Sequence, residues 1–197
     1  MDNVNHNSKE INKLYIKNMV CDRCIMVVRD TLKQIGIEPI NVKLGEVDIN
    51  QEIDAPIKSE LKQRLESLGF ELIDDKRMVI NERIKSLLIE LVHHNNCKLK
   101  TNLSDYLTDK LSLDYSYLSK LFSEINNTTI EKYFIAQKIE RVKELLIYDQ
   151  MSLNEIAYSL NYSSPAHLSS QFKSIIGQTP TEFKNDNNSP RMSLDKV

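Results

Sequence analysis

Two cysteines separated by two residues give this sequence its clearest chemistry. The cysteine pair, Cys21 and Cys24, lies where an alternating apolar run gives way to a helical pattern. A helix begins with unpaired N–H groups and the positive end of its dipole, and both stabilise thiolates. Two thiolates at this spacing can bind a soft metal ion, either Cu(I) with two sulfurs or Zn(II) with two further ligands from elsewhere. The same pair would also support dithiol–disulfide exchange.

The elements that position this pair form a predicted small α+β domain. Helical spacing indicates helices over 24–35 and from Pro56 to Leu68, followed by Gly36 and Gly69 where a helix commonly ends. Alternating or short apolar runs indicate four strands, near 14–16, 40–44, 47–49 and 70–73. The order is strand, helix, strand, strand, helix, strand. This is the ferredoxin-like β-α-β-β-α-β pattern, with a four-stranded antiparallel sheet and two helices on one face.

Residues 12–77 resemble the heavy-metal-associated domain of copper chaperones and metal-exporting ATPases. That family carries Gly-Met-x-Cys-x-x-Cys at this junction; Met19 and the cysteine pair match it, whereas Asn18 replaces the glycine. The resemblance implies that Met19 packs in the core beneath the metal loop, and that Gly69-Phe70 lies beside that loop. It implies Cu(I), or another soft ion such as Zn(II) or Cd(II), as the cofactor. The alternative is that the domain binds no metal and serves only dimerisation or packing.

Composition limits the class of protein. The 197 residues are 41% hydrophobic and 27% charged, values typical of a globular chain of one or two domains. The sequence has no apolar run of the roughly 18 residues needed to cross a membrane, and its start, MDNVNHNSKE, does not resemble a signal peptide. We therefore expect a cytoplasmic protein without a membrane partner. The net charge of −2 does not by itself favour nucleic acid.

After residue 78 the pattern is almost entirely helical and contains two segments with one plan. Each segment, 102–122 and 152–173, has a short helix, a tight turn and a second helix that begins after Asp or Ser as N-cap. A longer helix, about 130–148, lies between them. Asn161 can take the left-handed conformation in the second turn. In each second helix an apolar stripe faces inward and small polar residues face outward, as suits a helix in a major groove.

Residues 80–184 resemble the DNA-binding domain of the AraC/XylS family of transcription regulators, in which a long helix joins two helix-turn-helix units. The resemblance is carried, in order, by the stretches YLSKLF (117–122), KIERV (138–142), EIA (155–157) and FK…GQTP (172–180). It implies double-stranded DNA as the partner. By position, the DNA-facing residues are Ser116, Ser119 and Lys120 in the first unit, and Pro165, Ala166, Ser169, Ser170 and Lys173 in the second.

Of these DNA-facing residues, Lys120 and Lys173 are expected to contact phosphates or guanines. His167, outside that set, is a weaker candidate for the same contacts. Many relatives carry arginine at the position of Ser170, so base readout by the second unit is expected to be reduced. The stretch 98–184 carries equal numbers of basic and acidic residues. Phosphate neutralisation dominates DNA affinity, so we expect modest affinity for a monomer and dependence on a second DNA-binding domain in a homodimer.

The whole sequence is therefore interpreted as an α+β chain: a ferredoxin-like domain (12–77), an all-α domain with two helix-turn-helix units (80–184) and a disordered tail (185–197). We expect a sequence-specific transcription regulator that responds to a soft metal or to thiol redox state. The alternatives are a metal-handling protein whose helical part docks partners, and a regulator whose N-terminal domain only dimerises. The sequence has no Ser/His/Asp array and no phosphate-binding glycine loop, so we expect no enzyme. Cys97, His93 and His94 are expected to be structural or surface residues.

Overall fold

The computed structural model describes residues 11–99, 101–148, 151–185 and 194, and it divides into two compact units. Unit 1 ends at Arg83 and unit 2 begins at Ile84, so the division falls inside helix α3 (Lys76–Ile89). The domain limits expected from the sequence, 12–77 and 80–184, stay predictions. None of the helices in the described ranges combines the length and the apolar character needed to span a bilayer.

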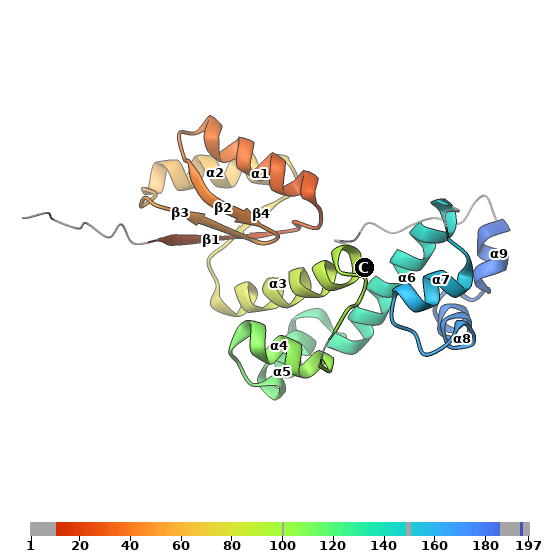
Figure 1. The fold of residues 1–197 in the computed structure, drawn as a ribbon. Helices are drawn as coiled ribbons and strands as arrows, with labels where there is room; N and C mark the ends of the chain where they lie inside the picture. The colour runs from red at the N-terminus through yellow and green to blue at the C-terminus, as the bar shows by residue number, and fades with distance from the viewer. Residues whose placement is uncertain (1–10, 100, 149–150, 186–193, 195–197) are drawn as a thin grey trace, which may run out of the picture. The chain divides into compact units, whose positions relative to one another are not determined.

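Unit 1 is a four-stranded antiparallel sheet with two helices on one face (Figure 1). The observed order of strands and helices agrees with the order predicted from the sequence, and the strands lie side by side as β2-β3-β1-β4. The elements before α3 are β1 (Asn12–Lys17), α1 (Asp22–Gln34), β2 (Pro39–Lys43), β3 (Glu46–Ile49), α2 (Ala55–Ser67) and β4 (Glu71–Ile73).

The ends of the two helices follow from their sequences. Gly36 has a φ of +78°, and its N–H donates to the carbonyl of Lys33 at 3.0 Å, so the predicted glycine stop of α1 is confirmed. At the start of α2, Asp54 accepts a hydrogen bond from the N–H of Ile57 at 2.9 Å, and Pro56 occupies the first turn. These caps fix where each helix meets the sheet.

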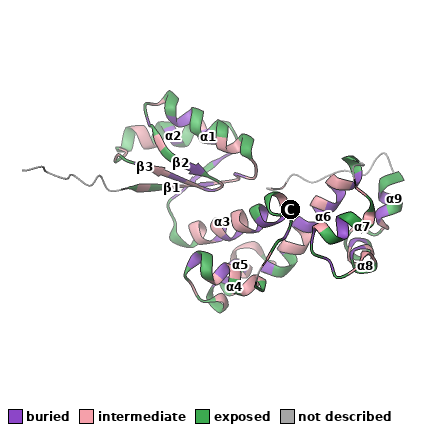
Figure 2. Ribbon diagram, in the orientation of Figure 1, coloured by how far each residue is buried: buried purple, intermediate pink, exposed green. Residues whose placement is uncertain are grey.

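The core of unit 1 lies between the sheet and the two helices, where residues of both layers are fully buried, including Ile16, Leu32 and Leu61 (Figure 2). One sequence expectation is wrong here. The alternating apolar run 40–44 begins at Ile40 and predicts an inward side chain there, yet Ile40 is 55% exposed. The register of β2 shifts between Pro39 and Asn41, so Ile40 is the extra residue of a bulge and leaves the inward alternation.

Unit 2 is entirely helical within the described residues. Its long helix α6 connects two pairs of helices that share one arrangement (Figure 1). The elements after α3 are η1 (Glu90–His94), α4 (Leu103–Leu111), α5 (Tyr115–Asn126), α6 (Ile130–Tyr148), α7 (Leu153–Ser159), α8 (Pro165–Ile176) and α9 (Pro180–Asn185). The predicted helix-turn-helix pairs correspond to α4–α5 and α7–α8.

Two features of the helical region differ from the sequence expectation. The helical pattern of 79–93 ends in a π-helical turn, η1, which the apolar periodicity did not predict. The predicted disordered tail 185–197 lies outside the described residues, except for Asn185 and Leu194. Asn185 is the last residue of α9, so the prediction was wrong for that residue.

Candidate nucleic-acid interface and thiol pair

The first helix-turn-helix pair is defined by side-chain caps at the start of both of its helices. Asn102 accepts a hydrogen bond from the N–H of Asp105 at 2.8 Å and so caps α4. Ser112 is the C-cap residue after α4, and its φ of +54° reverses the chain. Asp114 then caps α5 by accepting from the N–H of Ser116 at 2.8 Å. The turn is therefore only a few residues long, and it fixes the angle at which α5 leaves α4.

The second helix-turn-helix pair repeats this plan with different residues. Ser152 and Glu155 form a reciprocal capping box at the start of α7. The left-handed residue of the turn is Asn161, with a φ of +56°, which confirms the sequence prediction. Ser164 caps α8 by accepting from the N–H of His167 at 3.1 Å, and Pro165 occupies the first helical position.

An aromatic pair holds each second helix against the helix that follows it. Phe122 of α5 meets Tyr133 of α6 edge to face, with ring centroids 5.5 Å apart. Phe172 of α8 meets Phe183 of α9 in the same manner at 5.4 Å. The same number of positions separates Phe122 from Phe172 and Tyr133 from Phe183. Each half therefore has three helices, and α9 matches the start of α6.

The outward faces of α5 and α8 carry the residues that the sequence predicted to face DNA. Lys120, Ser170 and Lys173 have exposed side chains. Two of the serines already have partners nearby in the chain, one at the N-cap of its helix and one within its helix. The Ser116 hydroxyl donates to Asp114, and the Ser169 hydroxyl, which is half-buried, donates to the carbonyl of Pro165 at 3.0 Å. The other predicted residues are Ala166, which is exposed, and Ser119 and Pro165, which are half-buried.

One exposed aromatic residue was missed by the sequence reasoning. Tyr117 is 44% exposed on α5 and occupies the position that matches His167 on α8. The His167 ring is oriented by the hydroxyl of Ser163, 3.0 Å from Nδ1, and by edge-to-face contact with Tyr162. Alignment of the two segments could have shown that an aromatic or imidazole ring stands at the same place on both helices.

The equal numbers of basic and acidic residues in the helical region do not give the charge of its surface, because several charged residues of α6 are buried. Glu140 and Lys143 form an ion pair with both side chains inside the unit. The Lys138 ammonium lies 3.7 Å from the centroid of the Tyr162 ring, and burial lowers its pKa. The family-like stretch 138–142 therefore belongs to the core of unit 2.

The cysteine pair lies at the start of α1, as predicted. Cys21 is the N-cap residue, and its Sγ is 3.5 Å from the Sγ of Cys24. Burial raises the pKa of the Cys24 thiol, although hydrogen bonds from nearby backbone N–H groups act in the opposite direction. The thiolate stabilisation expected at this helix start is therefore outweighed by desolvation at Cys24.

The loop before the cysteine pair contains Asn18 and Met19. The Met19 side chain is 2% exposed and packs in the core of unit 1. Asn18 stands where the motif has glycine, and its φ of +70° is a conformation that asparagine tolerates better than most residues. Its side-chain amide donates to the carbonyl of Gly69 at 2.9 Å, so Gly69 does lie beside this loop.

The third cysteine and the two adjacent histidines have different surroundings. Cys97 is buried in the core of unit 2, which raises its pKa to about 11. Burial lowers the pKa of His93 to about 4, and its Nε2 lies 3.2 Å from Oε1 of Gln137. His94 is exposed. In the part of the chain that the structure describes, no group of three or more His, Cys, Asp and Glu residues could hold a metal ion.

Comparison with known proteins identifies the helical region. Residues 107–186 match the family model described as "Helix-turn-helix domain". The chain is 32% identical over 101 residues to the xylose operon regulatory protein of Escherichia coli K12, covering 51% of this chain and 26% of that protein. It is 31% identical over 80 residues to the Msm operon regulatory protein of Streptococcus mutans, covering 41% of this chain and 29% of that protein.

The solved structures include a DNA-binding transcriptional dual regulator from Escherichia coli K-12, with 22% identity and a TM-score of 0.46 over 54% of this chain and 89% of that one. The helical region of unit 2 is therefore similar to a helix-turn-helix domain and to part of two operon regulatory proteins. The homologues are regulators and not enzymes. The matched part of this chain spans less than a third of the length of the two curated relatives.

Proposed function

We propose that this chain is a sequence-specific transcription regulator that reads double-stranded DNA with α5 and α8. The observation that carries the proposal is the repeated three-helix plan of unit 2. In both halves, caps and a buried aromatic pair hold one helix so that small polar residues and a lysine stay exposed. A helix presented in this way is the element that helix-turn-helix proteins place in the major groove.

The side chains of α5 and α8 are expected to have different roles in DNA recognition. Lys120 and Lys173 supply the positive charge for phosphates or for the acceptors of guanine. Ala166 and Ser170 are small, so α8 can approach the base edges closely, and Ser170 can donate or accept a hydrogen bond there. Because the hydroxyls of Ser116 and Ser169 bond to the N-cap and to the backbone of their own helices, we expect them to shape the surface more than they read bases.

Selection of bound duplexes from a random DNA pool tests this function. We expect the chain to enrich one sequence motif, and we expect Lys120→Ala and Lys173→Ala to weaken binding to it. Lys33→Ala, a change on the surface of unit 1, is the matched control and should leave the affinity unchanged. Failure to enrich any motif, with the chain shown to be folded by circular dichroism, would contradict the proposal.

We also propose that the cysteine pair responds to a soft metal ion or to thiol oxidation, and that unit 1 is a ferredoxin-like domain of the heavy-metal-associated type. Support comes from the 3.5 Å separation of the two sulfurs, the buried Met19 and the strand order β2-β3-β1-β4. The donor set suits Cu(I), which accepts two sulfurs. Zn(II) or Cd(II) would need additional ligands, which a second chain in a homodimer could supply.

Competition between the reduced protein and a chelator for Cu(I), Zn(II) and Cd(II) tests the metal proposal. We expect stoichiometric binding that the double variant Cys21→Ser/Cys24→Ser loses and that the control Cys97→Ser, in unit 2, retains. Metal-dependent DNA affinity in the parent, absent from the double variant, would link the two units. Equal, weak metal binding by all three proteins would contradict the metal proposal. The remaining roles for unit 1 would then be thiol oxidation at the cysteine pair, or dimerisation alone.

The alternative of a metal-handling protein whose helices dock other proteins makes the opposite prediction. It requires tight metal binding by the cysteine pair together with no DNA binding under any metal or redox condition. The two assays described above therefore separate the two functions.

A further inference from the structure

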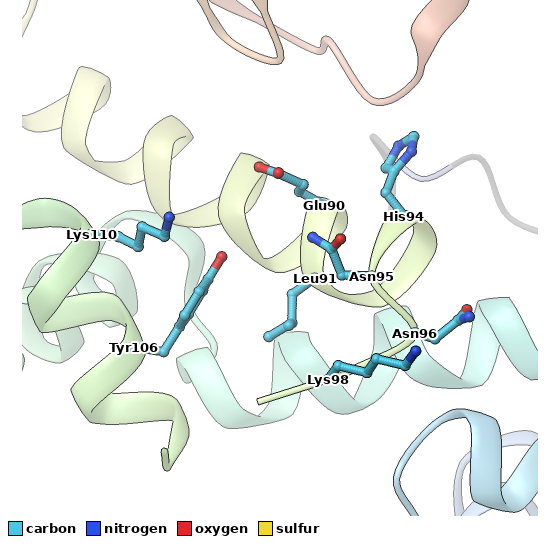
Figure 3. A pocket seen from close by; sticks show the side chains of 8 residues that line it. All are labelled: Glu90, Leu91, His94, Asn95, Asn96, Lys98, Tyr106 and Lys110. Carbon is cyan, nitrogen blue, oxygen red and sulfur yellow. The ribbon is translucent and has the colours of Figure 1, made fainter. Parts of the chain in front are cut away.

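A polar pocket lies in unit 2 beside the first helix-turn-helix pair. It has a volume of about 320 Å³ and opens between α4, the π-helical turn η1 and the loop that follows η1. Figure 3 shows Tyr106 and Lys110 projecting from α4 toward the turn η1, which carries Glu90, and toward Asn95, which follows that turn. Asn96 and Lys98, in the loop, line the pocket as well. A volume near 300 Å³ is within the range of small-molecule sites.

The backbone beside this pocket is held in two uncommon conformations. The five residues of η1 form a π-helical turn, a feature that occurs frequently at functional sites. Asn96 and Cys97 follow with φ values of +48° and +55°, two consecutive left-handed residues of which neither is glycine. Such residues are strained and persist where the surrounding structure enforces them.

The strained segment is fixed by the core of unit 2. The Cys97 side chain is buried there, and its N–H donates to the carbonyl of Leu91 at 2.8 Å. With Cys97 anchored inward, its neighbours Asn96 and Lys98 are exposed at the pocket. The left-handed pair therefore places an amide and an ammonium at the pocket wall.

The charges of the lining favour an anion. Lys98 and Lys110 are both exposed, and within the described residues neither ammonium forms an ion pair with a carboxylate. Glu90 is the acidic residue of the lining. Burial, together with the Glu90 carboxylate, raises the pKa of the Tyr106 hydroxyl. Like any tyrosine at neutral pH, Tyr106 is protonated and can donate a hydrogen bond. The amides of Asn95 and Asn96 can donate and accept.

From this lining we propose that the pocket binds a small hydroxylated organic anion, such as a sugar phosphate or a sugar acid. The phosphate or carboxylate would contact Lys98 and Lys110, and Tyr106 would donate to it. The hydroxyl groups of the ligand would donate to Glu90 and bond to the asparagine amides. One acidic acceptor beside two exposed lysines fits such a ligand better than an inorganic anion, which has few or no hydroxyls to donate.

The loop that follows η1 lies where a ligand in the pocket could regulate DNA binding. This extension rests on the proposed function. Asn96 and Lys98 also line a second pocket of about 450 Å³, together with Tyr158, Ser159 and Asn161. The loop therefore borders α4, the first helix of one helix-turn-helix pair, and the end of α7, the first helix of the other. A ligand that joins α4 to the loop would fix the first pair relative to the loop, and so change how α5 is presented.

Calorimetric titration of the full chain, without DNA, tests the site with four probes: glucose 6-phosphate, gluconate, glucose and inorganic phosphate. We expect saturable binding of glucose 6-phosphate or gluconate, at least about tenfold tighter than binding of glucose or phosphate. Lys98→Gln and Lys110→Gln should each weaken it about tenfold, the size of one charge-assisted hydrogen bond. Lys132→Gln, on the exposed start of α6, is the charge-matched control and should leave it unchanged.

Glu90→Gln distinguishes an anionic ligand from a cationic one. For a hydroxylated anion, this variant should keep or tighten binding, because it removes a negative charge and retains an acceptor. Three outcomes would each overturn the proposal. They are weaker binding by Glu90→Gln than by the parent, binding by the lysine variants as tight as by the parent, and no saturable binding of any probe. Since these titrations contain no DNA, their outcome is separate from that of the DNA selection.

Discussion

The two halves of unit 2 share one architecture but differ in nearly every residue that faces outward. Both halves have a capped first helix, a left-handed turn residue, a capped second helix and a buried edge-to-face aromatic pair. On their exposed faces, α5 carries Tyr117 and Lys120 where α8 carries His167 and Ser170. The comparison indicates that the interior fixes how each helix is presented, whereas the exposed residues determine what each helix recognises.

The largest predicted effect concerns the shared interior. Phe122 and Phe172 are both fully buried and each meets an aromatic ring. We expect Phe122→Ala and Phe172→Ala to lower the free energy of unfolding by similar amounts, about 3–5 kcal/mol each. Chemical denaturation of both variants measures this. A difference of more than about 2 kcal/mol would show that the two halves are not equivalent in packing.

The next effect concerns the exposed faces. Lys120→Ala and Lys173→Ala should each weaken binding to the selected DNA by about 1–3 kcal/mol if the lysine contacts guanine. If the contact is to a phosphate, the loss should be similar for all sequences, and the slope of affinity against salt should fall by about one. Fluorescence anisotropy at several salt concentrations separates the two cases. Unchanged affinity in both variants would contradict the assignment of α5 and α8 to the DNA interface.

A smaller effect tests the ends of the two recognition helices. The C-cap residue after α8 is Gly177, with a φ of +85°, and the C-cap residue after α5 is Asn127, with a φ of +53°. A Cβ at Gly177 would meet no atom within 4 Å, so Gly177→Ala should cost only the backbone strain, about 1–2 kcal/mol. Asn127→Gly relieves such strain and should not destabilise the chain. Thermal unfolding of both variants checks these opposite signs.

The smallest effect depends on pH and distinguishes the two N-caps. Hydrogen bonds from the Ser116 side chain and backbone lower the pKa of Asp114 below its ordinary value of 3.8. The ionised cap therefore stabilises the folded state above pH 3.8, and this contribution is lost as pH falls through the lowered pKa. Asp114→Ser should remove this part of the acid dependence, because the Ser164 cap of α8 does not titrate. Denaturation curves between pH 2 and pH 5 measure it, and an unchanged curve would contradict the assignment.

The sequence predicted the order of elements and the two helix-turn-helix pairs because local signals define them. Gly36, Pro56 and Asn161 each act through their own backbone preference, and each acts where expected. The bulge at Ile40 was missed because strand alternation is read within one strand, whereas a bulge depends on pairing with the next. The π-helical turn was missed because a single extra residue barely disturbs the apolar period.

The predicted site residues also show that a sequence pattern gives positions on an element but not the contacts made there. Positions on the outward faces of α5 and α8 follow from helical period, so Lys120, Ser170 and Lys173 could be named from the sequence. The hydrogen bonds that occupy the Ser116 and Ser169 hydroxyls depend on caps and turns of the helix, and the sequence pattern does not show them. Likewise, the burial that raises the pKa of Cys24 depends on packing between elements.

The central claim is that both halves of unit 2 contact DNA. Hydroxyl-radical footprinting of the full chain on its selected duplex, beside the variants Lys120→Ala and Lys173→Ala, tests it most directly. The account predicts two separate protected segments, with one weakened by each variant. A single protected segment that responds to only one variant, or protection that neither variant changes, would contradict it.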